Sequence, residues 1–354
     1  MKKIMLVFGT RPDAIKMCPL VLELKKRKGF EVKVCLTGQH REMLDSVTEV
    51  FGVKADYDLS VMAKDQSLSR LTSKIIDGIT PIFEREKPDI VLVHGDTATA
   101  LASALAAFYM RIPIGHIEAG LRTYDISSPY PEEFNRRAVS LISDYDFAPT
   151  EAAKENLIRE GKNPERVFVT GNTVVDALKY TAREAQTDEK LILLTAHRRE
   201  NIGEPMRNIF TAVREIARKY PDYKIVYPMH PNPAVRSLAE SILGKTENVE
   251  LREPLGLLEF HSLLARAFAV LTDSGGVQEE AAALGKPTLV LRDTTERTES
   301  GSLLLVGTNS ESILAAFDRL VADKDHYNAI KTAPNPYGDG NASERIADIL
   351  EKMI

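Results

Sequence analysis

Short apolar runs alternate with longer amphipathic stretches along the first half of the chain. Runs of strand length lie at residues 3–9, 30–38, 89–96 and 112–120, and stretches with a helical period lie at 13–28, 40–52 and 97–110. Strands that are apolar throughout and alternate with helices are typical of a parallel sheet that helices cover on both faces. The pattern predicts a doubly wound α/β domain.

The same alternation begins again in the second half. Strand-like runs lie at 190–201, 224–232, 267–276 and 286–293, and helical stretches lie at 206–220, 234–243 and 277–285. The weakest periodicity is at 167–190, which we interpret as the connection. We therefore expect two Rossmann-like domains facing a cleft, at 1–172 and 173–340, with a last helix at 341–354 that packs on the first domain.

Size and charge agree with this organisation. The chain has 354 residues, which suits two α/β domains better than one core. Its net charge of −5 provides no overall basic field, so we expect neither nucleic acid nor an acidic membrane as a partner. Any anion must be held by local groups.

The apolar runs are too short for a leader or a membrane span. Residues 4–8 fall below the ~7–15 residues of a signal-peptide core. Residues 100–110 fall below the ~20 that cross a bilayer. With Cys18 and Cys35 as its two cysteines and no zinc spacing, we expect a cytoplasmic protein with reduced thiols and no metal.

Polar side chains follow most of the predicted strands. In open parallel sheets, ligands bind beyond the carboxyl ends of the strands, so these positions are candidate site residues. They are Gly9, Arg11, Lys16, Asp96, Glu118, Glu132, Glu133, His197, Arg198, Ser274, Gly275, Gly276, Glu296 and Arg297.

Each candidate also has an ordinary structural interpretation. Ser274 could simply cap a helix, although the Ser-Gly-Gly amides at a helix start would also stabilise an anion such as a pyrophosphate. Glu132 could pair with Arg136 four residues later. His197 and His230 could be packed, hydrogen-bonded histidines. Only the convergence of these residues on strand ends favours a site.

The absence of three common catalytic and cofactor-binding motifs reduces the number of reaction classes to consider. The chain has no G-x-G-x-x-G after a strand, no P-loop and no G-x-S-x-G, which leaves nicotinamide, P-loop and serine-hydrolase chemistry without support. An anion site in the second domain and several carboxylates in the first remain. Together they indicate a nucleotide-linked substrate and acid–base chemistry on its organic part.

A series of short motifs, spread in order over nearly the whole chain, is similar to that of a known enzyme family. They include "FGTRPDAIKMCPL", "GQHREML", "VLVHGDT", "GHIEAGLRT", "PEEFNRR", "TGNTVVDAL", "TAHRREN", "YPMHPNP", "LTDSGGVQEEAAALGKP" and "RDTTER". This set resembles the non-hydrolysing UDP-N-acetylglucosamine 2-epimerases. The resemblance implies a glycosyltransferase-B-like fold, a homodimer, no cofactor, and interconversion of UDP-GlcNAc and UDP-ManNAc for cell-surface polysaccharide biosynthesis.

The resemblance also implies roles for individual residues. It assigns catalysis to Asp96, Glu118, Glu132 and His197. It assigns substrate and UDP binding to Arg11, Lys16, Arg136, Phe260, Ser274, Gly275, Gly276, Glu280 and Arg297. It implies a second, activating UDP-GlcNAc site at Gln39, Glu132, Arg198 and His230.

The implied mechanism eliminates UDP to give 2-acetamidoglucal and then adds UDP back, with proton removal and delivery on opposite faces of C2. Which carboxylate serves which face stays open. Two other functions are compatible with the same architecture: a glycosyltransferase that uses a UDP-sugar, and a non-catalytic sugar-nucleotide sensor. The sensor would have no need of Asp96, Glu118 and Glu132 together, and the transferase would need an acceptor groove.

Overall fold

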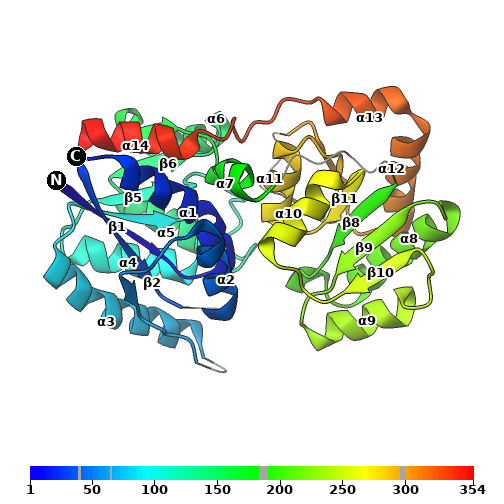
Figure 1. Ribbon diagram of the computed structural model, residues 1–354, viewed down its shortest axis with the longest axis horizontal. Helices are drawn as coiled ribbons and strands as arrows, with labels where there is room; N and C mark the ends of the chain where they lie inside the picture. Colours follow the sequence, from blue (N-terminus) through cyan, green and yellow to red (C-terminus); the bar gives the residue numbers. More distant parts are fainter. Residues whose placement is uncertain (39–40, 64–65, 183–189, 296–299) are drawn as a thin grey trace. The chain divides into compact units, whose positions relative to one another are not determined.

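The computed structural model describes residues 1–38, 41–63, 66–182, 190–295 and 300–354 (Figure 1). Its contacts divide the chain into two units: unit 1 comprises Met1–Tyr180 and Tyr337–Ile354, and unit 2 comprises Thr181–Pro336. The predicted boundary after residue 172 falls at the start of a helix, α7 (Thr173–Thr181), whereas the division falls at its end.

Unit 1 contains, within the described residues, a seven-stranded parallel sheet in the order β3-β2-β1-β4-β5-β6-β7. The strands are β1 (Lys2–Phe8), β2 (Phe30–Leu36), β3 (Tyr57–Asp58), β4 (Ile90–His94), β5 (Ile114–Ile117), β6 (Tyr145–Ala148) and β7 (Val167–Val169). The order reverses beside β1, so β4 lies next to it and β5 next to β4. The carboxyl ends of these three strands are therefore adjacent.

Helices cover both faces of this sheet (Figure 1). The helices of unit 1 are α1 (Arg11–Lys26), α2 (Arg41–Phe51), α3 (Leu68–Glu86), α4 (Ala98–Tyr109), α5 (Glu132–Ile142), α6 (Glu151–Arg159), α7 and α14 (Ala342–Met353). Thr10 and Asp13 form a capping box that starts α1 directly after β1. This cap places Arg11 and Lys16 at the carboxyl edge of the sheet.

The last helix returns to unit 1 and packs on α1, where Arg27 pairs with Asp348 at 2.8 Å. The buried Asp176 carboxylate of α7 accepts from the amides of Ala342 and Ser343 at 3.1 and 2.7 Å, which caps the start of α14. This cap ties α7 to unit 1, even though the weak periodicity of its segment predicts a connection.

Unit 2 contains, in its described part, a six-stranded parallel sheet in the order β10-β9-β8-β11-β12-β13. The strands are β8 (Leu191–Thr195), β9 (Lys224–Pro228), β10 (Val249–Arg252), β11 (Ala269–Thr272), β12 (Thr288–Val290) and β13 (Leu303–Leu305). The helices are α8 (Glu204–Lys219), α9 (Pro233–Leu243), α10 (Leu257–Arg266), α11 (Gly275–Ala283), α12 (Ser310–Ala322) and α13 (Lys324–Lys331).

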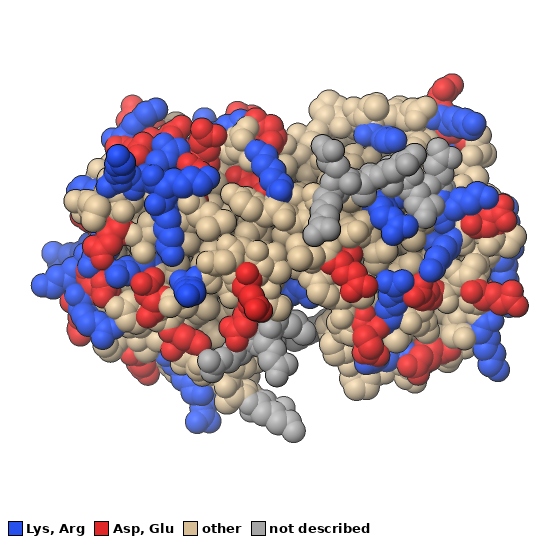
Figure 2. All heavy atoms as spheres, viewed as in Figure 1, with Lys and Arg blue, Asp and Glu red and all other residues tan. Residues whose placement is uncertain are grey.

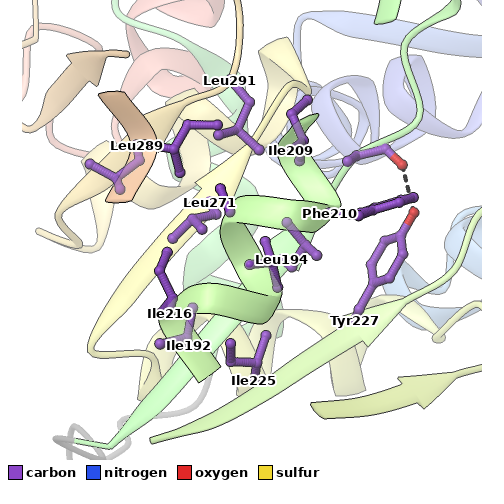
Figure 3. Close-up of a cluster of buried hydrophobic side chains, with 14 of the residues drawn as sticks. Ile192, Leu194, Ile209, Phe210, Ile216, Ile225, Tyr227, Leu271, Leu289 and Leu291 are labelled. Atoms are coloured by element: carbon purple, nitrogen blue, oxygen red, sulfur yellow. Dashed lines mark hydrogen bonds between the residues drawn. The ribbon is translucent and has the colours of Figure 1, made fainter. Parts of the chain in front are cut away.

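Alternate residues of β8 enter two different cores. Ile192 and Leu194 pack with α8, α9 and α12 on one face of the sheet, as Figure 3 shows in part. Leu191 and Leu193 pack with α10 and α11 on the other face. Because side chains alternate across a strand, a strand buried on both faces has to be apolar throughout. This explains the continuous apolar runs and confirms the predicted doubly wound α/β class.

One face of the molecule can be followed in a space-filling view. On the face drawn in Figure 2, basic and acidic side chains are interspersed on each unit, without an extended area of one sign. None of the helices in the described part of the chain has both the length and the hydropathy of a membrane-spanning segment.

Candidate active site

Asp96, Glu118 and Glu132 lie at the carboxyl edge of the unit 1 sheet. Asp96 follows β4, Glu118 follows β5, and Glu132 is the first residue of α5. The side chain of Arg136 contacts the Asp96 carboxylate, and Asn135 Nδ2 donates to the Asp96 carbonyl at 2.8 Å. The start of α5 therefore holds the loop after β4 in place.

Glu118 is bound by groups from three other elements. Lys16 of α1 contacts its carboxylate, Asn172 Nδ2 donates to Oε2 at 2.7 Å, and His94 Nε2 lies 3.6 Å from the same oxygen. The side chain is 8% exposed. A carboxylate surrounded by donors in a buried site is held in one orientation, as a proton-transfer group requires.

The backbone of Glu118 is also unusual, with a φ of +61°. Residues other than glycine rarely occupy this left-handed region, and they do so mostly where the surrounding structure compensates for the strain. This strained backbone makes Glu118 a candidate for a functional role.

Two buried side chains, Asp13 and His94, form a pair, and His94 lies next to Glu118. The two groups approach at 3.3 Å, and Asp13 also accepts from the amide of Thr10 at 3.3 Å. Burial alone would lower the pKa of His94, but Glu118 and Asp13 outweigh it and raise that pKa to about 9. Two cations, Lys16 and His94, thus face two carboxylates, Asp13 and Glu118.

Glu133 organises the loop that follows β5. Its buried carboxylate accepts from the amides of Thr123 and Tyr124, each at 3.1 Å. Arg122 at the start of this loop makes a bidentate pair with Glu160 at 2.8 and 2.9 Å. The two anchors fix the charged loop between Glu118 and Glu132, so its lack of a regular period reflects side-chain anchoring.

In unit 2, the buried Asp273 carboxylate joins the loops after β8 and β11. It accepts from the amides of His197 and Arg198, each at 2.9 Å, and from Asn201 Nδ2 at 3.0 Å. The His197 ring stacks on His230, with centroids 5.1 Å apart and planes 13° apart. The predicted residues His197, Arg198 and His230 therefore lie together.

The start of α11 has the geometry of an anion site. Ser274 occupies the N-cap without a side-chain cap bond, so simple capping does not explain this serine. Outside its own helix, a Cβ added at Gly276 would meet no atom of the described residues within 4 Å, so these residues leave room beside the backbone there. Amides at a helix start stabilise negative charge.

Two further predicted residues lie on the helices around this site. Glu280 is 6% exposed on α11, and Phe260 of α10 is half-buried beside the core. His261 Nε2 lies 3.6 Å from the Glu280 carboxylate, and His261 Nδ1 lies 2.6 Å from Thr181 Oγ1. Three of the predicted candidates, Gln39, Glu296 and Arg297, lie outside the described residues.

Sequence reasoning missed the residues that hold the candidates in place. They are Asp13, His94, Asn172, Asn201, His261 and Asp273. They stand inside the motifs or directly before the strand ends, so position next to a predicted site residue was the available signal. Within the described residues, no group of three or more His, Cys, Asp or Glu side chains is arranged to hold a metal.

Two doubly wound parallel-sheet units in one chain, with polar groups gathered at strand ends, define an α/β enzyme of glycosyltransferase-B-like fold. The particular family follows from the sequence: the family profile described as UDP-N-acetylglucosamine 2-epimerase matches residues 22–351. The chain belongs to this family and is an isomerase, as the resemblance implied.

Relatives match over nearly their whole length. The UDP-N-acetylglucosamine 2-epimerase of Bacillus subtilis (strain 168) is 51% identical over 359 residues, with 98% of this chain and 94% of the relative covered. The crystal structure of UDP-GlcNAc 2-epimerase from Neisseria meningitidis bound to UDP-GlcNAc is 48% identical, with a TM-score of 0.94 and 99% and 100% coverage. The enzyme from Methanocaldococcus jannaschii in complex with UDP-GlcNAc and UDP is 36% identical, with a TM-score of 0.86 and 99% of each chain covered.

Proposed function

We propose that this enzyme interconverts UDP-GlcNAc and UDP-ManNAc by eliminating and re-adding UDP through 2-acetamidoglucal. The observation that carries the proposal is the set of carboxylates Asp96, Glu118 and Glu132 at one edge of the unit 1 sheet, two of them contacted by Arg136 and Lys16. Proton transfer at a weakly acidic carbon needs positioned acids and bases of this kind.

The reaction balances without an external reagent. A carboxylate takes the C2 proton, the C2–H electrons form the C1–C2 double bond, and the C1–O pair leaves with UDP. In the return step the UDP oxygen attacks C1, and the C2 carbon takes a proton on the opposite face. Removal and delivery on opposite faces require two separate groups, which accounts for more than one carboxylate.

We assign the UDP group to unit 2 and the proton transfers to unit 1. The amides at Ser274, Gly275 and Gly276 stabilise the diphosphate, with Glu280 at the ribose and Phe260 at the uracil. Arg11, Lys16, Arg136, His197 and Arg297 complete the set that opposes the negative charge of the leaving group. Positive and polar groups that are already oriented toward the developing charge lower the activation barrier for breaking the C1–O bond.

A second, activating UDP-GlcNAc is assigned to Gln39, Glu132, Arg198 and His230. The stacking of His230 on His197 supports this assignment, because a ligand on His230 would act on His197 directly. Burial and the neighbouring His197 lower the pKa of His230, so this ring is neutral at physiological pH and suited to stacking or hydrogen bonding.

The assembly is assigned as a homodimer through the exposed faces of α4 and α5. Phe108, Tyr109, Phe134 and Leu141 are apolar side chains that are 47–82% exposed. On α5, Phe134 and Leu141 are seven residues apart and lie on the same side of the helix. Apolar stripes of this kind mark interaction surfaces. We assign the enzyme to the cytoplasm, where its product feeds cell-surface polysaccharide biosynthesis.

The test is incubation with UDP-GlcNAc and no acceptor. The proposal predicts UDP-ManNAc as the product and, on prolonged incubation, small amounts of free UDP and 2-acetamidoglucal. A chain that leaves UDP-GlcNAc unchanged until an acceptor is added would be a transferase, and that outcome would refute the proposal.

A further inference from the structure

Both polar atoms of the Asn172 side chain and its backbone amide make hydrogen bonds to other residues. Its Nδ2 donates to Glu118 Oε2 at 2.7 Å, its Oδ1 accepts from the amide of Val174 at 3.0 Å, and its own amide donates to the carbonyl of Tyr337 at 2.8 Å. The residue is 2% exposed. A side chain that is held at both of its polar atoms, on a backbone that is itself hydrogen-bonded, has little freedom to reorient.

Asn172 lies where the chain leaves unit 1, next to the segment that returns to it. It precedes α7, the helix through which the chain leaves unit 1, and Tyr337 is where the chain returns. The adjacent Gly171 has a φ of +87°, and a Cβ there would lie 3.1 Å from the Tyr337 carbonyl. Only glycine permits this close approach at low cost, so the geometry around Asn172 is fixed by the backbone.

We propose that Asn172 is a positioning residue that holds the carboxylate of Glu118 in its working orientation. The inference rests on the proposed role of Glu118 in proton transfer. Lys16 of α1 and His94 of β4 face the same carboxylate, and Asp13 faces His94. Of these neighbours, Asn172 is the uncharged donor, so it fixes the direction of the carboxylate without adding charge to the cluster.

The two polar atoms of the Asn172 side chain make different contacts, so a substitution that changes only one of them can distinguish positioning of Glu118 from helix capping. In Asn172→Asp, an oxygen can still accept from the Val174 amide, so the local turn is kept. The donor to Glu118 is replaced by a second carboxyl group, and two carboxyls at this distance share one proton. A capping role alone would therefore tolerate aspartate, whereas a positioning role would not.

The experiment compares the full-length wild type with Asn172→Asp, Asn172→Ser and a matched control, Asn163→Asp. Asn163 is exposed, and its Oδ1 likewise accepts from an amide two residues on, that of Glu165 at 3.0 Å. Each protein is assayed for kcat and KM on UDP-GlcNAc across pH 5–9 and melted across the same range.

For Asn172→Asp we expect kcat at pH 7 to fall roughly 10–100-fold with KM nearly unchanged, as for loss of a hydrogen bond to a charged group. The acidic limb of the kcat profile should move up by about one pH unit or more because of the shared proton. Asn172→Ser should lower kcat with a smaller shift of the limb. The control should match the wild type.

The thermal melting measurements do not depend on catalytic activity. A carboxyl pair whose folded pKa is raised loses stability as pH rises above the unfolded value, so Asn172→Asp should melt progressively lower than the wild type from pH 5 to pH 8. Wild-type kcat and pH profile in Asn172→Asp, or a loss of kcat with an unmoved limb and a pH-independent melting difference, would overturn the inference. Failure of the wild type to epimerise would instead refute the proposed function, and the melting arm would still report whether Asn172 touches Glu118.

Discussion

Replacing Asp273 with asparagine should loosen the loops that carry His197 and Ser274. The fully buried carboxylate accepts from two backbone amides, those of His197 and Arg198, and from Asn201. Hydrogen bonds to a charged group contribute about 1 kcal/mol more than neutral ones. Three such bonds weakened together amount to roughly 3 kcal/mol, from a typical total stability of 5–15 kcal/mol.

The assay is thermal unfolding of the full-length protein, together with calorimetric titration of UDP. At about 2–4 °C per kcal/mol for a unit of this size, the Asp273→Asn transition should fall by roughly 6–12 °C. We expect UDP affinity to drop about tenfold or more, because the α11 amides and His197 lose their common anchor. The control is Asp222→Asn, since Asp222 is exposed and pairs with the exposed Lys190 at 2.9 Å.

Exposed ion pairs contribute about 0–1 kcal/mol, so by the same conversion the control should melt within about 4 °C of the wild type. An Asp273→Asn protein that melts like the wild type and binds UDP with unchanged affinity would refute this reasoning. It would show that the two loops hold their geometry without the carboxylate.

The remaining predictions concern turnover, pH and assembly. Amide replacements of the acids, Asp96→Asn, Glu118→Gln and Glu132→Gln, should each lower kcat by about 10²–10⁴-fold while calorimetry shows UDP binding retained. His94 has its folded pKa raised from 6.5 to about 9, so the stability it contributes is fully present below pH 6.5 and lost as pH rises through about 9. Melting of His94→Gln should therefore approach that of the wild type between these pH values; a constant difference would contradict the charged His94. Leu141→Glu should turn a dimer into a monomer in sedimentation, and an unchanged dimer would place the interface elsewhere.

Much of the fold was predictable because its strands are buried on both faces. β8 is apolar along its whole length since alternate side chains enter two cores, and this property can be recognised without coordinates. The strand ends could be predicted for the same reason, and with them the positions of Asp96, Glu118 and His197. The helix α7 was harder, because its membership of unit 1 depends on the Asp176 cap of α14, which is remote in sequence.

The supporting residues could not be predicted from their own motifs. His94 reaches Asp13 and Glu118 only because β4 lies between β1 and β5, and strand order is a tertiary property. Asn172 resembles any residue that precedes a helix until the returning segment at Tyr337 is placed beside it. Residue type and spacing thus indicated which groups to propose for the chemistry, and the topology determined which groups hold them.

The most direct test of the proposed mechanism is to run the reaction in D₂O and to examine C2 of the product. A proton taken by one carboxylate and supplied by another exchanges with solvent, so newly formed UDP-ManNAc should carry deuterium at C2, which NMR and mass spectrometry both detect. Product that is epimerised at C2 but retains only protium would contradict the account, because the hydrogen would then have moved without passing through an exchangeable carboxyl group.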